Sequence, residues 1–224
     1  MEGAFLLIDK PLKWTSFDVV NKIRKTLCQQ LGIRKIKVGH AGTLDPLATG
    51  LVIICTGGAT KKISRFQEME KTYEAEIQLG ATTPSFDLET MVDRVYPWEH
   101  INLPLVEEVL AEFKGEHEQL PPVFSAKSVH GKRAYESARR GETVELLPVR
   151  IHISKLEITH FALPHLSVRV ECSKGTYIRA LARDLGIALG SGAHLTGLRR
   201  TVIGPYQVKN AFAPDNFFNK LKLL

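Results

Sequence analysis

Asp45 stands alone as an acidic residue in the most basic part of the chain. Residues 21–65 contain nine lysines and arginines, and Asp45 is the one acidic residue among them. A carboxylate can act as a nucleophile, a general base or an electrostatic stabiliser, provided that it stays ionised. Neighbouring cations lower the pKa of a carboxyl group, so we expect Asp45 to be charged at neutral pH. The structural alternative is an Asp–Pro turn with Pro46, in which the carboxylate accepts backbone hydrogen bonds.

Four other residues could bind a ligand or assist chemistry. Tyr73 could stack on a nucleobase, although it also fits an apolar core face. Tyr177 and Arg179 follow the turn at 173–176, whose backbone N–H groups would suit an anion at a helix start; an ordinary helix cap explains them equally well. His40 lies in a glycine-rich loop, whereas the other histidines lack metal-ligand spacing. We therefore expect no metal site.

The elements that would position these residues follow from periodicity and turn chemistry. Residues 38–50 hold three glycines and one proline, which predicts a loop with special backbone angles. The segments with strand or helix periodicity are predicted as strands at 3–8, 51–55, 71–80, 151–161 and 166–172, and as helices at 16–31, 103–113, 132–140 and 176–189. Strands that come in adjacent pairs favour an α+β fold with a largely antiparallel sheet in one domain.

Composition and motifs exclude several classes of protein. The longest apolar runs, such as residues 51–55, are far below the roughly 18 residues of a membrane span, and the N-terminus lacks the basic region of a signal peptide. Phosphate-binding, dinucleotide-binding, serine-hydrolase and zinc-protease signatures are absent. Residues 21–65 carry a net charge of +8 and residues 122–224 one of +9, on either side of an acidic block of −10. The possibility that these exclusions leave open is a reaction on a polyanion that needs no cofactor.

The loop at 39–50, with the sequence GHAGTLDPLATG, closely resembles the signature of the TruB family of pseudouridine synthases. Further segments resemble the motifs of that family in the same order along nearly the whole chain: LLIDKP at 6–11, KTYEA at 71–75, the stretch 121–127 with Gly131 and Lys132, CSKGTYIR at 172–179, and LRR at 198–200. The resemblance implies the pseudouridine synthase fold, with a mixed, largely antiparallel central sheet flanked by helices and an RNA-binding cleft.

The resemblance also implies an activity and a role for each site residue. Members of the family convert uridine 55 in the T-loop of tRNA to pseudouridine, without cofactor or metal. Asp45 would be the essential carboxylate and Arg179 its ionic partner. The other residues implied at the substrate are Tyr73 stacking on the base, Tyr177 and Leu198 as pocket walls, His40 filling the space that the flipped base leaves, and Lys10 and Lys61 as basic residues near the cleft.

Several points stay open at the level of sequence. Asp45 could attack C1′, add to the base or remove the 2′ proton. A non-catalytic chaperone of the tRNA T-arm, or a glycosidase that releases uracil, would share the same RNA partner. We expect a cytoplasmic monomer with one catalytic domain over residues 1–224. Residues 201–224 would be a short extension packed on that domain, without the PUA domain of many bacterial relatives.

Overall fold

The computed structural model describes residues 2–124, 128–129, 132–133 and 146–213. Within these residues the main sheet follows the order β1-β3-β12-β4-β11-β10-β7, with β2 paired to β3 and β13 paired to β12. β3 pairs antiparallel with β1 and with β2, β10 pairs antiparallel with β7 and with β11, and β12 pairs antiparallel with β13, whereas β12 and β3 are parallel. The expected α+β class with a largely antiparallel sheet is therefore confirmed. The chain forms two compact units, and β4 and β12 each contribute residues to both.

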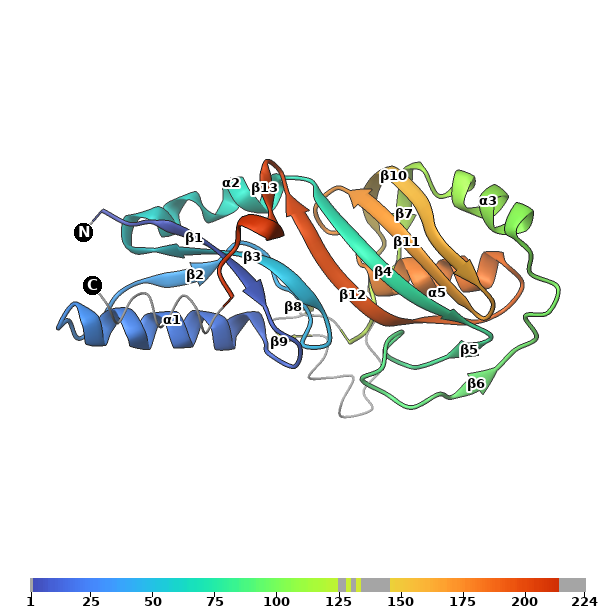
Figure 1. Ribbon diagram of the computed structural model, residues 1–224, viewed down its shortest axis with the longest axis horizontal. Coiled ribbons are helices and arrows are strands. Elements are labelled where there is room, and N and C mark those ends of the chain that lie inside the picture. The colour runs from blue at the N-terminus through green and yellow to red at the C-terminus, as the bar shows by residue number, and fades with distance from the viewer. Residues whose placement is uncertain (1, 125–127, 130–131, 134–145, 214–224) are drawn as a thin grey trace. The chain divides into compact units, whose positions relative to one another are not determined.

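The first unit comprises the described residues up to 74 together with those from 198 onward. Its elements are β1 (Phe5–Lys10), α1 (Ser16–Gln30), β2 (Val38–His40), β3 (Thr49–Thr56), η1 (Gly57–Lys62), α2 (Ile63–Glu68), the first half of β4 (Lys71–Leu79), the second half of β12 (Ala193–Ile203), β13 (Tyr206–Gln207) and η2 (Val208–Asn210). β1 and β3 lie side by side, and α1 packs next to β2 (Figure 1). One cluster of apolar side chains in the core of this unit consists of Ala41, Leu51, Ile53, Cys55, Phe66 and Ile203.

Helix α1 begins where its sequence predicts. The Thr15 side chain accepts a hydrogen bond from the Asp18 N–H at 3.0 Å, and the Asp18 carboxylate accepts one from the Thr15 N–H at 2.9 Å. This reciprocal capping box satisfies N–H groups that a helix start leaves without partners. Gly32, with a φ of +61°, follows the end of the helix, as expected for a glycine beyond the last turn.

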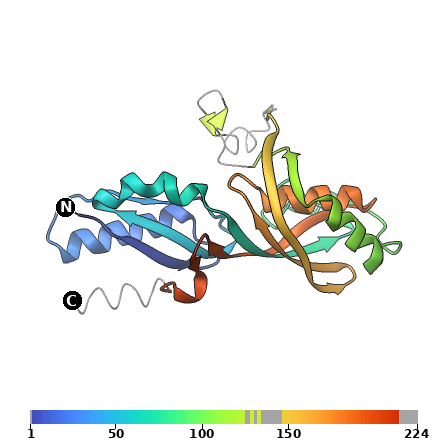
Figure 2. The same cartoon turned by 90° about the horizontal axis from the view of Figure 1, so that it is seen from above.

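The second unit comprises residues 75–197 as far as they are described. Its elements are the rest of β4, β5 (Ala81–Thr82), β6 (Arg94–Val95), α3 (Leu103–Glu112), β7 (Gly115–Gln119), β8 (Ser128–Val129), β9 (Lys132–Arg133), β10 (Val149–Ala162), β11 (His165–Cys172), α5 (Ile178–Ala188) and the start of β12. β10 and β11 form a long antiparallel hairpin, and α3 packs against β10 and α5 (Figure 2).

Two sequence-based expectations need comment. The helix predicted over 132–140 is wrong at its start, because Lys132 and Arg133 form β9 and pair with β8; residues 134–140 lie outside the described residues. The expected packing of the C-terminal extension is described only as far as residue 213. There the backbone of Phe212 exchanges hydrogen bonds of 2.9 Å with Leu7 and Asp9 on β1.

Two glycines with positive φ allow a matched test of backbone packing. Gly50 has a φ of +109°, and a Cβ built on it would lie 2.2 Å from the Arg200 carbonyl oxygen, whereas nothing lies within 4 Å of a Cβ at Gly32. We predict that Gly32→Ala lowers the free energy of unfolding by about 1 kcal/mol, the cost of left-handed backbone. Gly50→Ala should cost more than about 3 kcal/mol, because backbone must move as well. Urea denaturation measures both; equal losses would contradict the packing described for Gly50.

Candidate active site

The loop that carries Asp45 connects β2 to β3, both in the first unit. It leaves β2 after His40 and enters β3 at Thr49. Gly42 and Gly50 have φ values of +114° and +109°, which explains the glycines on either side of Asp45. The Ala48 N–H donates to the Asp45 carbonyl oxygen at 3.1 Å and closes a tight turn through Pro46. Asp45 itself is half-buried, as suits a carboxylate that has to reach a ligand.

The start of α1 holds the loop from one side. The Ser16 hydroxyl, which is buried, accepts a hydrogen bond from the Leu44 N–H at 2.9 Å and lies 3.2 Å from the Leu44 carbonyl oxygen, to which it donates. The Lys13 N–H donates to the Pro46 carbonyl oxygen at 2.8 Å. The residues on both sides of Asp45 are thus tied to the first residue of α1 and to the segment before it.

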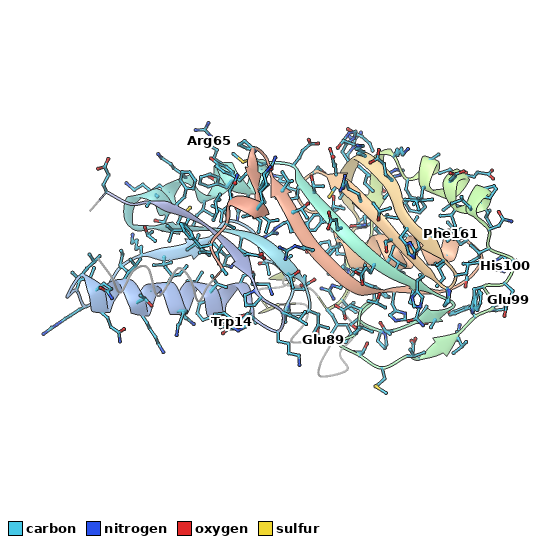
Figure 3. The ribbon with its side chains drawn as sticks, viewed as in Figure 1. Trp14, Arg65, Glu89, Glu99, His100 and Phe161 are labelled. Carbon is cyan, nitrogen blue, oxygen red and sulfur yellow. The ribbon has the colours of Figure 1, made fainter. Side chains whose placement is uncertain are left out.

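Lys10, at the end of β1, holds the same loop through its ammonium group. Its side chain is fully buried, and Nζ donates to the carbonyl oxygens of Trp14, Pro11 and Pro46 at 2.6, 2.9 and 3.4 Å. Trp14 lies just before α1 (Figure 3). Burial lowers the pKa of Lys10 from 10.5 to about 8; the negative charge of Asp45 opposes this shift and the positive charge of Arg200 adds to it. Lys10 and Asp45 therefore interact electrostatically.

The remaining predicted residues of the first unit occupy different positions. Tyr73 is buried on β4, Leu198 is half-buried on β12, and His40 is half-buried at the end of β2. Lys61 is exposed on η1. Their contacts with a target base stay predictions.

Tyr177 and Arg179 belong to the second unit, at the beginning of α5. Arg179 is buried, and its guanidinium donates to the carbonyl oxygens of Phe124 at 2.8 Å and Ser85 at 3.1 Å. The Tyr177 backbone N–H donates to the side chain of Gln119 at 2.8 Å. The helix-start position predicted for both residues is confirmed, whereas the pairing of Arg179 with Asp45 stays a prediction.

The second unit also contains a buried carboxylate that was not predicted from the sequence. Asp87 is buried and lies 3.5 Å from Nε of Arg179. It also accepts hydrogen bonds from Ser85 Oγ at 2.6 Å and from the backbone N–H of Glu89 at 2.9 Å; Glu89 is marked in Figure 3. Residues 81–100 show turn chemistry without periodicity, so nothing in the local pattern singles out Asp87.

Arg200 is a further site residue that was not predicted from the sequence. It stands in the LRR motif at 198–200, and its side chain is buried against the Asp45 loop. Only its place beside Leu198 in the motif pointed towards it.

The described residues contain no group of three or more histidine, cysteine, aspartate or glutamate side chains that could hold a metal ion. None of the described helices is long and apolar enough to cross a membrane.

Comparison with solved structures identifies the class of the fold. The chain matches the crystal structure of a Cbf5–Nop10–Gar1 complex with a TM-score of 0.72 and 26% sequence identity, over 96% of this chain and 53% of that one. It therefore spans about half of the structure it matches. A structure of an H/ACA RNP bound to a substrate RNA containing 2′-deoxyuridine gives a TM-score of 0.68 at 24% identity. The architecture is the pseudouridine synthase fold.

Comparison with known sequences identifies the family. Residues 27–178 match the N-terminal domain of TruB family pseudouridylate synthases, and residues 179–217 match a tRNA pseudouridylate synthase B C-terminal domain. A protein of Phocaeicola vulgatus named tRNA pseudouridine synthase B is 61% identical over 96% of this chain and 92% of its own length. One of the same name from Parabacteroides distasonis is 60% identical over 95% and 91%. The chain belongs to the TruB family of pseudouridylate synthases.

The titration of Lys10 predicts how activity depends on pH. Above about pH 8 its ammonium group loses a proton, and the neutral amine is a weaker donor to the loop carbonyls and no longer faces Asp45 with a positive charge. We expect the rate of pseudouridine formation under single-turnover conditions to fall as the pH rises through about 8. The Lys10→Arg variant stays charged over this range. Its rate, whatever its absolute value, should therefore not fall near pH 8. A wild-type rate that is constant from pH 7 to 9.5 would contradict the prediction.

Proposed function

We propose that this chain is a tRNA pseudouridine-55 synthase, in which Asp45 is the essential carboxylate. The observation that carries the proposal is the position of Asp45 in the loop that the family model covers, between residues whose backbone is held on both sides. Relatives named tRNA pseudouridine synthase B, at 60% identity and above over nearly the whole chain, support tRNA as the substrate.

The reaction is an isomerisation that balances without any co-reactant. The C1′–N1 bond of uridine breaks, the uracil turns while it stays bound, and a C1′–C5 bond forms. The hydrogen on C5 leaves as a proton, and N1 carries a proton in the product, so neither mass nor oxidation state changes. A carboxylate beside an anomeric carbon can stabilise positive charge there or form a bond to it, as in glycosidases, and it can also accept a proton.

The other site residues receive roles in recognising the base. Tyr73 would stack on the uracil, and Tyr177 and Leu198 would form walls of its pocket. His40 would take the place of the base in the RNA helix after flipping. Arg179 would orient the Asp45 carboxylate through a charge-assisted hydrogen bond. Its guanidinium plane is already fixed by the carbonyl groups of Ser85 and Phe124, which supports a role that depends on direction.

The basic residues of the first unit would bind the RNA backbone. Exposed cations occupy α1, the segment after it, η1 and α2: Lys22, Lys25, Arg34, Lys35, Lys37, Lys61, Lys62 and Arg65. Arg65 projects from α2 (Figure 3). Contacts to phosphates release counterions, and they would offset the few kcal/mol that base flipping costs. Such an enzyme would act in the cytoplasm, where tRNA is processed. It would act as a monomer, because the proposal requires one copy of the chain.

Asp45→Asn tests the carboxylate directly. The amide is almost isosteric but is neither a base nor a nucleophile, so we expect pseudouridine formation to fall at least about 1,000-fold. The dissociation constant for tRNA should stay within about threefold, because the phosphate contacts remain. Radiometric release of tritium from 5-³H-uridine in tRNA measures the rate, and filter binding measures the affinity. A variant that modifies tRNA at the wild-type rate would refute the role of Asp45.

Mapping the product at single-nucleotide resolution tests the position and the reaction class together. An unmodified tRNA transcript incubated with the pure protein should acquire one pseudouridine, at position 55, and a transcript with cytidine at that position should acquire none. A chaperone of the T-arm would bind and refold the transcript without forming pseudouridine. A glycosidase would release free uracil, which chromatography of the reaction mixture detects.

A further inference from the structure

Arg200 lies on β12 and contacts both ends of the loop that carries Asp45. Its side chain is 1% exposed; Nη2 donates to the Gly42 carbonyl oxygen at 3.3 Å, Nη1 to that of Thr43 at 3.2 Å, and Nε to that of Leu51 at 2.8 Å. The Arg200 backbone also pairs with Gly50 in the parallel ladder between β12 and β3. One residue thus joins the two ends of the loop.

Burying the guanidinium group of Arg200 costs free energy that an apolar side chain filling the same space would not cost. None of the ion pairs among the described residues includes Arg200, and its N–H groups are satisfied by carbonyl oxygens. A buried charge without a counter-charge costs several kcal/mol, and apolar side chains of similar volume often stabilise a fold better. The value of Arg200 therefore has to come from something that an apolar side chain lacks.

Directed hydrogen bonding is what an arginine adds here. Its planar fork presents five N–H groups at fixed angles, whereas a lysine carries a single ammonium group on a flexible stem. The Gly42 and Thr43 carbonyl groups lie three and two residues before Asp45. Ser16 fixes Leu44, the next residue, through both its N–H and its carbonyl oxygen. The path of the backbone into Asp45 is therefore set residue by residue.

The neighbouring residue provides a contrast. Arg199 forms a bidentate ion pair with Asp9, with distances of 2.7 and 3.1 Å, and its side chain is 38% exposed. It also donates to the Thr49 hydroxyl at 3.3 Å. Arg199 carries the same side chain as Arg200 and lies on the same strand. The hydrogen bonds described for it reach none of the residues from Gly42 to Pro46.

We propose that Arg200 is a positioning residue for the reaction, whose guanidinium fixes the backbone at Gly42, Thr43 and Leu51 and so aims the Asp45 carboxylate at the target nucleotide. The inference rests on the proposed role of Asp45. Arg200 does not need to touch the RNA, and its effect should be on the chemical step rather than on the affinity for tRNA.

The electrostatics of Lys10 supply an independent signature. The charged groups that act on Lys10 are Asp45, Arg200, Asp18 and Asp9, and among these Arg200 lowers the pKa of Lys10. Loss of the positive charge of Arg200 should therefore raise the pKa of Lys10. The fall in rate near pH 8 should move to higher pH in Arg200→Gln and much less in Arg200→Lys. A midpoint that stays in place in Arg200→Gln would contradict the electrostatic interaction between Arg200 and Lys10.

The experiment compares Arg200→Lys and Arg200→Gln with the control Arg199→Gln. Single-turnover rates with saturating enzyme, tRNA dissociation constants and melting temperatures are measured for each. We expect both Arg200 variants to lose about 100-fold or more in rate, the loss typical of a misplaced catalytic group, with dissociation constants within about threefold of the wild type. Arg199→Gln should retain a rate within about threefold.

The possible contrary results separate the two proposals. Folded Arg200 variants with rates within about threefold of the wild type would overturn the positioning role, even if Asp45→Asn is inactive. So would an equal loss in Arg199→Gln, or the unfolding of both Arg200 variants at the assay temperature, since Arg200 would then serve the fold alone. An active Asp45→Asn would instead refute the proposed function, whatever the Arg200 variants do.

Discussion

The loop between β2 and β3 depends on buried cations that bind backbone carbonyl groups. Lys10 donates to Pro11, Trp14 and Pro46, and Arg200 donates to residues on both sides of the loop. A tight loop with positive-φ glycines cannot pair carbonyl groups such as those of Gly42, Thr43 and Pro46 in a sheet or a helix, and leaving them buried without donors would be costly. Charged donors form stronger hydrogen bonds than neutral ones, so they can hold a shape that the backbone alone would not keep.

This arrangement has a consequence for catalysis. Both neighbours of Asp45 are anchored: Leu44 to Ser16, and Pro46 to Lys10 and to the backbone of Lys13. A group that is fixed in advance gives up less entropy when it meets its substrate, and a misplacement of about 1 Å can cost 100-fold in rate. In the second unit Arg179 is held in a similar way, by Ser85, Phe124 and Asp87. Each unit thus fixes its own charged side chain through local acceptors.

Local patterns predicted much of the fold. The helix predicted over 16–31 and the strand predicted over 71–80 rest on short-range periodicity, and both are confirmed, as α1 and β4. The resemblance to a family located Asp45, which its basic surroundings alone left open to a structural reading. The helix predicted at 132–140 was wrong at its start because β9 pairs with β8 there, and pairing between strands can override a helical spacing.

The anchoring of the site could not be predicted in the same way. Arg200 and the carbonyl groups it binds are 149 to 158 residues apart in the chain, so no local pattern connects them. The resemblance implies Lys10 only as a basic residue near the cleft, and its full burial follows from its position at the end of β1 beside the Asp45 loop. Asp87 lies in a stretch without periodicity, and its ion pair is with Arg179, which is distant in sequence.

The central claim is that the backbone around Asp45 is fixed before RNA binds. Amide hydrogen exchange of the free protein tests it most directly, because the N–H of Leu44 bonds to Ser16 and that of Ala48 bonds to the Asp45 carbonyl oxygen. We predict that both amides exchange as slowly without tRNA as with it, and nearly as slowly as the amides in the middle of β3. Exchange at the rate of an unstructured peptide, with protection gained only when tRNA is added, would contradict the account.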